Sequence, residues 1–111
     1  MNIYDTANRL ASEIKQSEEY VNYKMAKEAL NLNQELKNKI SEFEKVRYDA
    51  QLTAMKTGKN DEEKMKKMQD LYIELIENSE AKKYFEAETK FNIIIADVNK
   101  IIGEAIREVM Q

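Results

Sequence analysis

The stretch that decides the fold is SEAKKYFEAETKFNIIIADVNKIIGEAIREVMQ, residues 79–111. It contains no proline, and its one glycine is Gly103. Apolar residues recur along it at intervals of three and four, which is typical of an α-helix with one broad apolar face. They are Tyr84, Ala87, Phe91, Ile94, Ile95, Val98, Ile101, Ile102, Ala105, Ile106 and Val109. The pattern predicts one uninterrupted helix to the end of the sequence.

The length of this predicted helix indicates self-association. At 1.5 Å per residue it spans about 45–50 Å, whereas a compact domain of about 100 residues has a radius of gyration of about 13 Å. Apolar residues continue to Val109, and a bare apolar end favours association. We therefore predict a homodimer, which is the commonest oligomer. An elongated monomer with a frayed tail is the alternative.

Four further helices precede it. The first runs from about Ile3 to Gln16, with Asn2 as its N-cap. Ser17 caps a second segment that reaches about Leu30, although one helix kinked at Ser17 is an alternative. A third helix begins after Asn33 and carries a heptad-like apolar seam typical of a coiled coil. That seam consists of Leu36, Ile40, Phe43, Arg47, Ala50 and Ala54.

The strongest turn signal is Thr57-Gly58-Lys59-Asn60. Gly58 suits the left-handed position after a helix, and Asn60 is expected to cap the helix that follows. A turn this short predicts an antiparallel hairpin between the third and fourth helices. The sequence therefore predicts one all-α domain over residues 1–111, a bundle of about five helices with a long antiparallel hairpin and a long C-terminal helix.

The composition restricts the chemistry. Apolar residues make up 42% and charged residues 35%, and the chain has two glycines, no proline, no histidine and no cysteine. These absences remove the usual general base, the thiolate nucleophile and the usual zinc ligands. The ferritin type of di-iron site also needs histidine. We therefore expect a protein that is not an enzyme and has no cofactor and no bound metal.

The net charge of −3 provides no overall positive field for nucleic acid, so direct nucleic-acid binding is not expected. The sequence has no apolar run long enough to cross a membrane, and its first residues do not resemble a signal peptide. We expect a cytoplasmic location and no membrane association.

Two sets of residues are candidate interfaces. Tyr48, Leu52 and Met55 form a second apolar row on the third helix, and tyrosine and methionine are common at interfaces. The alternative is that another helix of the chain covers this row. On the last helix the candidates are Phe85, Ala96, Ile102, Gly103 and Ile106. The small residues at 96 and 103 would allow close helix packing, although a tolerated glycine near a frayed end explains Gly103 equally well.

Arg47 lies inside the apolar seam and would need a carboxylate partner if it were buried. Glu88 is the candidate, although Arg47 can also extend to the surface along its aliphatic stem. Five lysines surround the hairpin turn and could contact RNA, but acidic residues at 61–63 favour a solvated surface. The lysines are Lys56, Lys59, Lys64, Lys66 and Lys67.

The layout resembles a known family. Ile14-Lys15-Gln16-Ser17-Glu18, Asn33-Gln34-Glu35-Leu36 and Thr57-Gly58-Lys59 occur in order, followed by Phe85-Glu86-Ala87-Glu88 and the run from Phe91 to Ile102. Over nearly the whole chain this is similar to the bacterial YlbF/YmcA family, including its short YheA-type members. The resemblance implies a dimerising helical bundle and a regulatory or adaptor protein that acts through protein–protein interaction. It also implies a link to RNase Y-dependent mRNA processing, competence, sporulation or biofilm control.

One feature departs from the family. YlbF carries a cysteine-rich tail for iron–sulfur clusters, and this sequence has no cysteine to supply such ligands. Two other functions stay open beside the adaptor. One is a structural helical-hairpin protein like the small type VII secretion substrates, although their Trp-x-Gly turn is missing here. The other is an RNA-binding helical protein.

Overall fold

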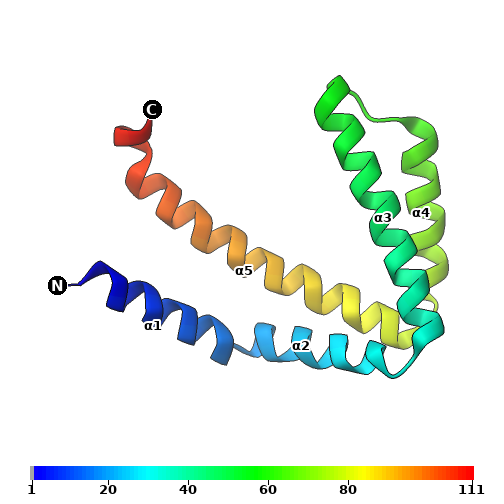
Figure 1. Cartoon of the computed structure of the whole chain (residues 1–111), viewed down its shortest axis with the longest axis horizontal. Helices are drawn as coiled ribbons and strands as arrows, with labels where there is room; N and C mark the ends of the chain where they lie inside the picture. Colours follow the sequence, from blue (N-terminus) through cyan, green and yellow to red (C-terminus); the bar gives the residue numbers. More distant parts are fainter. Residues whose placement is uncertain (1) are drawn as a thin grey trace. The chain divides into compact units, whose positions relative to one another are not determined.

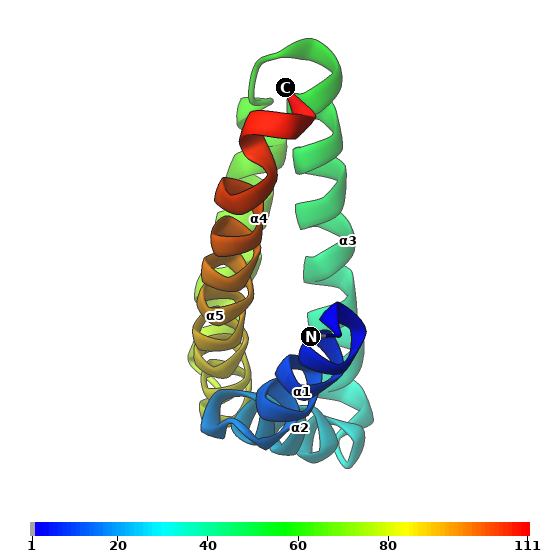
Figure 2. The same ribbon diagram turned by 90° about the vertical axis from the view of Figure 1, so that its left-hand side faces the viewer.

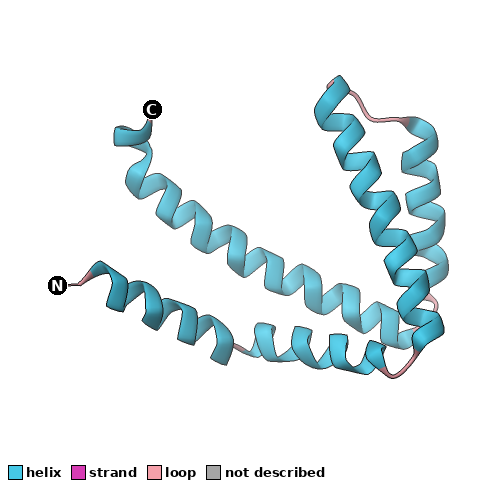
Figure 3. Ribbon diagram, viewed as in Figure 1, coloured by secondary structure: helices cyan, strands magenta, loops and turns pink. Residues whose placement is uncertain are grey.

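The computed structural model describes residues 2–111, and these form five α-helices joined by short loops (Figures 1 and 3). In chain order they are α1 (Ile3–Gln16), α2 (Glu18–Asn31), α3 (Gln34–Thr57), α4 (Glu62–Ile76) and α5 (Ser79–Met110). No strand occurs among the described residues. The predicted all-α class and the number of helices are confirmed.

The helices group into two compact units. One contains α1, the part of α2 up to Ala26, and α5 from Tyr84 onward. The other is Lys27–Lys83, which contains α3 and α4. The single domain over residues 1–111 stays a prediction.

Local capping explains where the helices begin and end. The side-chain oxygen of Asn2 accepts a hydrogen bond from the backbone N–H of Tyr4 at 2.8 Å, as the sequence predicted. Ser17 has extended backbone angles, and its hydroxyl oxygen accepts from the N–H of Tyr20 at 3.2 Å. This confirms two separate helices at Ser17, because an extended residue with its own capping bond ends one helix and starts the next.

The hairpin turn follows the prediction at its glycine and differs at its cap. Gly58 has φ +76°, the left-handed conformation that glycine adopts at little cost. The cap of α4 is Asp61 and not Asn60, because the Asp61 carboxylate accepts from the N–H groups of Glu63 and Lys64. The prediction of Asn60 was wrong by one residue. A carboxylate caps as well as an amide and interacts better with the positive helix end.

The Gly58 turn joins α3 and α4 at one end of the hairpin (Figure 2). Side chains between the two helices hold the hairpin closed. The Phe43 ring lies 5.8 Å from the ring of Tyr72, centroid to centroid. Lys64 crosses from α4 to α3, where its amine lies 3.1 Å from the Asp49 carboxylate and 2.7 Å from the Thr53 hydroxyl. The buried apolar residues of this unit are Leu30, Leu36, Ile40, Phe43, Ala50, Leu75 and Ala81. The predicted antiparallel hairpin is confirmed.

In the other unit, aromatic rings join α2 to the first half of α5. Tyr23 lies between two rings of α5, 5.7 Å from Tyr84 and 5.6 Å from Phe91. Tyr20 meets the edge of the Phe91 ring at 5.8 Å. Tyr84 and Phe85 are buried. This contact is therefore the core of the unit, and it covers only the first part of α5.

Candidate interaction surfaces

The second half of α5 leaves its apolar face in solvent. We call residues 98–110 the distal α5 segment. Val98 is half-buried, and every residue from 99 to 110 is exposed. Ile101 is 68% exposed, and Ile102, Ile106 and Val109 are also exposed. By helical periodicity these four residues share one face, with Glu104 and Glu108 along one edge of it. This is an amphipathic helix with its apolar face uncovered.

Helix α1 is also poorly covered. None of its described residues is buried, and Ile3 and Tyr4 are exposed. Leu10 and Ile14 on the same apolar face are half-buried. An isolated helix of 14 residues is marginal in water, and α1 has no buried residue that would add to its stability.

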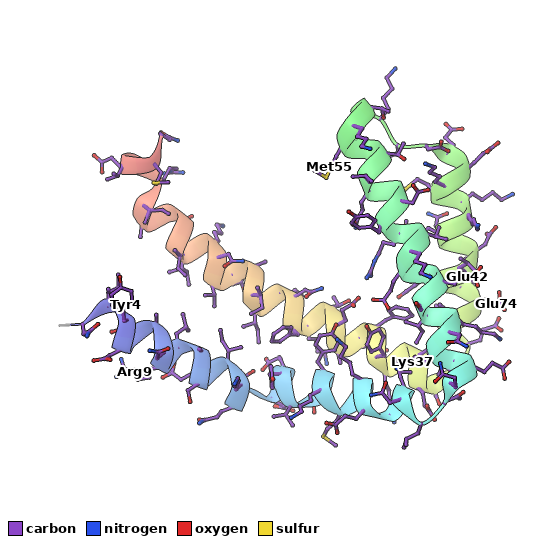
Figure 4. The ribbon with its side chains drawn as sticks, in the orientation of Figure 1. Tyr4, Arg9, Lys37, Glu42, Met55 and Glu74 are labelled. Carbon is purple, nitrogen blue, oxygen red and sulfur yellow. The ribbon has the colours of Figure 1, made fainter. Side chains whose placement is uncertain are left out.

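The predicted interface row on α3 is accessible. Tyr48 is 66% and Met55 82% exposed, while Leu52 between them is half-buried. Met55 projects from α3 on the side away from α4 (Figure 4). The interface at this row stays a prediction, as does the alternative in which another helix of the chain covers it.

The hairpin also carries an apolar groove of about 550 Å³, which we call the hairpin groove. It is lined by Phe43 and Arg47 from α3 and by Met68, Gln69, Tyr72 and Ile73 from α4. Tyr72 and Ile73 are exposed. Aromatic residues, methionine and arginine are the types enriched at protein interfaces. The sequence analysis missed the groove, because only the exposure of Ile73 and Tyr72 separates it from an ordinary helix seam.

Arg47 lies at the edge of the hairpin groove. Its guanidinium carbon lies 5.4 Å from the centre of the Phe43 ring, within the range of a cation–π contact. One guanidinium nitrogen lies 3.7 Å from the Glu44 carboxylate, one turn earlier on α3. The Arg47 side chain is 32% exposed. It therefore keeps part of its charge in solvent.

Glu88 has a different environment. It is 8% exposed, and one of its carboxylate oxygens accepts hydrogen bonds from the hydroxyls of Tyr23 at 3.4 Å and Tyr84 at 3.5 Å. The sequence analysis did not predict these tyrosine partners, although Tyr84 precedes Glu88 by one helical turn. The ion pair between Arg47 and Glu88 stays a prediction.

The remaining candidates on α5 fall into different surroundings. Phe85 is buried, whereas Ala96, Ile102, Gly103 and Ile106 are exposed. A β-carbon added at Gly103 would meet no heavy atom within 4 Å.

The lysines near the turn do not form a uniform cationic patch. Lys64 forms an ion pair with Asp49 within the hairpin. Lys66 and Lys67 alternate with Glu63, Asp70 and Glu74 along one face of α4. Phosphate recognition relies on a concentration of positive charge, which this mixed surface does not provide.

Comparison with known proteins identifies the family. A family model described as "Control of competence regulator ComK, YlbF/YmcA" matches residues 3–107. This chain belongs to the YlbF/YmcA family. The match covers all five helices almost completely, so membership applies to the whole fold and not to one motif. The family is described as a regulatory one and not as a class of enzymes.

Individual relatives support the same placement. A UPF0342 protein of Desulfitobacterium hafniense is 36% identical over 110 residues, covering 99% of this chain and 89% of the relative. A UPF0342 protein of Clostridium novyi is 33% identical over 96% of this chain and 93% of its own length. One from Caldicellulosiruptor bescii is 33% identical, with 95% and 88% covered. This family member is thus similar to proteins of about its own length.

Two observations concern metal binding and membrane-spanning helices. Among residues 2–111, no group of three or more acidic side chains is arranged to hold a metal ion. None of the described helices is long and apolar enough to cross a membrane.

Proposed function

We propose that this protein is a non-enzymatic regulator that acts by binding proteins, and that it forms a homodimer in the cytoplasm. The observation that carries the proposal is the uncovered apolar face of the distal α5 segment, with Ile101 68% exposed. Monomeric proteins rarely leave a contiguous apolar stripe of this kind in water, and such stripes mark interaction sites. Membership of a regulatory family supports the same function.

The proposed process follows from the family. We expect the protein to influence RNase Y-dependent mRNA processing, and through it competence, sporulation or biofilm formation. The family's description names control of the competence regulator ComK, which supports a regulatory effect in general. Deleting the gene and sequencing transcript ends would test the specific process. Unchanged RNase Y cleavage sites in the deletion strain would contradict it.

The homodimer is tested by the mass in solution. Light scattering after size exclusion at low micromolar concentration should give twice the chain mass of 13.1 kDa. Ile102→Asp should return the mass to that of one chain, because a charge in a desolvated apolar contact is costly. Lys100→Asp is the matched control, since Lys100 lies away from the apolar face of the same helix. A wild-type mass of 13.1 kDa at all concentrations would contradict the homodimer.

A further inference from the structure

We propose that α1 is a strap that closes over the apolar face of the distal α5 segment of its own chain, and that this closure competes with the homodimer for that face. The competition rests on the homodimer proposed above, whereas the closure does not. Helix α1 and the distal α5 segment belong to one compact unit, and each leaves an apolar face in solvent. Both helices would therefore gain burial from the same movement.

The contacts between α2 and α5 set the direction and the register of this closure. Tyr20 packs against Phe91, and Tyr23 packs against Tyr84 and Phe91, so the two helices run antiparallel. The residue numbers of the pair Tyr20 and Phe91 add to 111. Ser17 is extended, and an extended residue advances about 3.3 Å against 1.5 Å in a helix, which adds about one residue of length. Continued along α1, the register therefore pairs residues whose numbers add to about 112.

In this register the apolar face of α1 meets the apolar face of the distal α5 segment position by position. The pairs are Ile14 with Val98, Leu10 with Ile102, Ala7 with Ala105, and Ile3 with Val109. On both helices the intervals are four, three and four residues, the spacing of a coiled-coil seam. A shift of the register by one residue would instead bring Asp97, Glu104 and Glu108 opposite the seam. The sequence therefore favours one register over its neighbour.

The structure shows the beginning of this contact. Leu10, Ile14 and Val98, which lie nearest the α1–α2 junction, are half-buried. Ile3 at the other end of α1 is 75% exposed, and Val109 is 85% exposed. The two helices diverge toward the chain ends (Figures 1 and 2). Helix α1 thus has the coverage expected of a strap that is held at one end.

Ser17 provides the joint for the movement. Its backbone angles are φ −66° and ψ 148°, so it ends the helical hydrogen bonding of α1. Its hydroxyl donates to the carbonyl oxygen of Ile14 at 2.6 Å and accepts from the N–H of Tyr20 at 3.2 Å. These bonds lie within three residues of Ser17, so they define the junction without tying α1 to α5. A change of dihedral angles at one residue would redirect the whole of α1.

Closure would make dimerisation weaker than the distal α5 segment alone allows. A chain in the closed form has no apolar face to offer a second copy, so the apparent affinity falls by the fraction of chains that are open. Ala7→Asp places a charge in the seam at an exposed position and should hold the strap open. Dimerisation of this variant should be about tenfold stronger if the closed form is about ten times as populated as the open one. Asn8→Asp, outside the seam, is the matched control and should leave the affinity unchanged.

Disulfide trapping tests the closure directly, because the natural chain contains no cysteine. In the register proposed here the double variant Ala7→Cys/Ala105→Cys places two small residues face to face, where close helix packing suits the short reach of a disulfide. Oxidation of the dilute protein should give a disulfide within one chain. The oxidised chain should have a mass of 13.1 kDa by light scattering, and reduction should restore the dimer. Asn8→Cys/Ala105→Cys is the control and should give little disulfide within the chain.

The outcomes separate the closure from the homodimer. No disulfide within the chain, or one that links position 7 of one chain to position 105 of another, would overturn the closure. An oxidised chain that still dimerises would overturn the competition, because the closed strap would then leave the dimer contact free. A natural protein that stays monomeric at all concentrations would contradict the homodimer and with it the competition. The disulfide would still decide whether α1 closes over the distal α5 segment.

Discussion

Phe43 is 4% exposed and its ring packs against Tyr72, so it joins the two helices of the hairpin. Phe43→Ala should lower the free energy of unfolding by about 3–5 kcal/mol, because it removes a buried ring and leaves a cavity. Urea denaturation at one fixed protein concentration measures this. Tyr4→Ala removes an exposed ring from α1 and should change stability by less than about 0.5 kcal/mol. Equal effects would mean that Phe43 is not a core residue.

Glu88 provides a second prediction at the residue scale. Its carboxylate accepts hydrogen bonds from Tyr23 and Tyr84, which join α2 to α5. Glu88→Ala removes this acceptor from a buried site and should cost about 1–3 kcal/mol. Glu88→Gln keeps an oxygen acceptor of the same shape and should cost less. If both variants unfold at the same urea concentration as the natural protein, the tyrosine contacts do not stabilise the unit.

At the scale of the element, a substitution at Gly103 distinguishes two interpretations of α5. Either this glycine lies in open space, or it allows another helix to pack closely against it. The structure leaves open space around this residue, so an added methyl group meets no neighbour within the chain. Gly103→Ala should stabilise the helix by about 0.4–1 kcal/mol, because alanine loses less backbone entropy. The dimer mass should not change, since position 103 lies beside the apolar face and not within it. Loss of the dimer would instead support close helix packing at Gly103.

The cap of α4 can be tested in the same way. Asp61→Ala should cost about 1 kcal/mol, because two backbone N–H groups lose their acceptor. Asn60→Ala is the matched control one residue earlier and should cost less. Thermal unfolding followed by circular dichroism measures both variants. If Asn60→Ala lowered the stability more than Asp61→Ala, the N-cap of α4 would be Asn60, the residue predicted from the sequence.

The helices were predictable because their signals are local. Asn2, Ser17 and Gly58 each determine a boundary through backbone atoms a few residues away, so periodicity and caps are sufficient. Asn60 and Asp61 are both good caps, and sequence could not choose between them. Surfaces are harder to predict, because Phe43 and Ile101 lie in equally regular apolar stripes. One is buried and the other exposed, and that difference depends on which helices meet.

For the whole molecule, dimerisation should make the melting temperature depend on protein concentration. A dimer that unfolds to two separate chains becomes more stable as its concentration rises. Two chains of 111 residues have an unfolding enthalpy of about 155 kcal/mol at about 0.7 kcal/mol per residue. Each tenfold increase in concentration should then raise the melting temperature by about 3 °C.

The same experiment shows which part of the chain causes the dependence on concentration. Ile101→Asp places a charge on an exposed residue, so it should leave the fold of each chain intact while removing the dimer contact. Its melting temperature should therefore be lower and independent of concentration. If the natural protein already melts at one temperature from micromolar to millimolar concentration, no dimer couples to its folding. If Ile101→Asp keeps the dependence, the dimer forms through another surface.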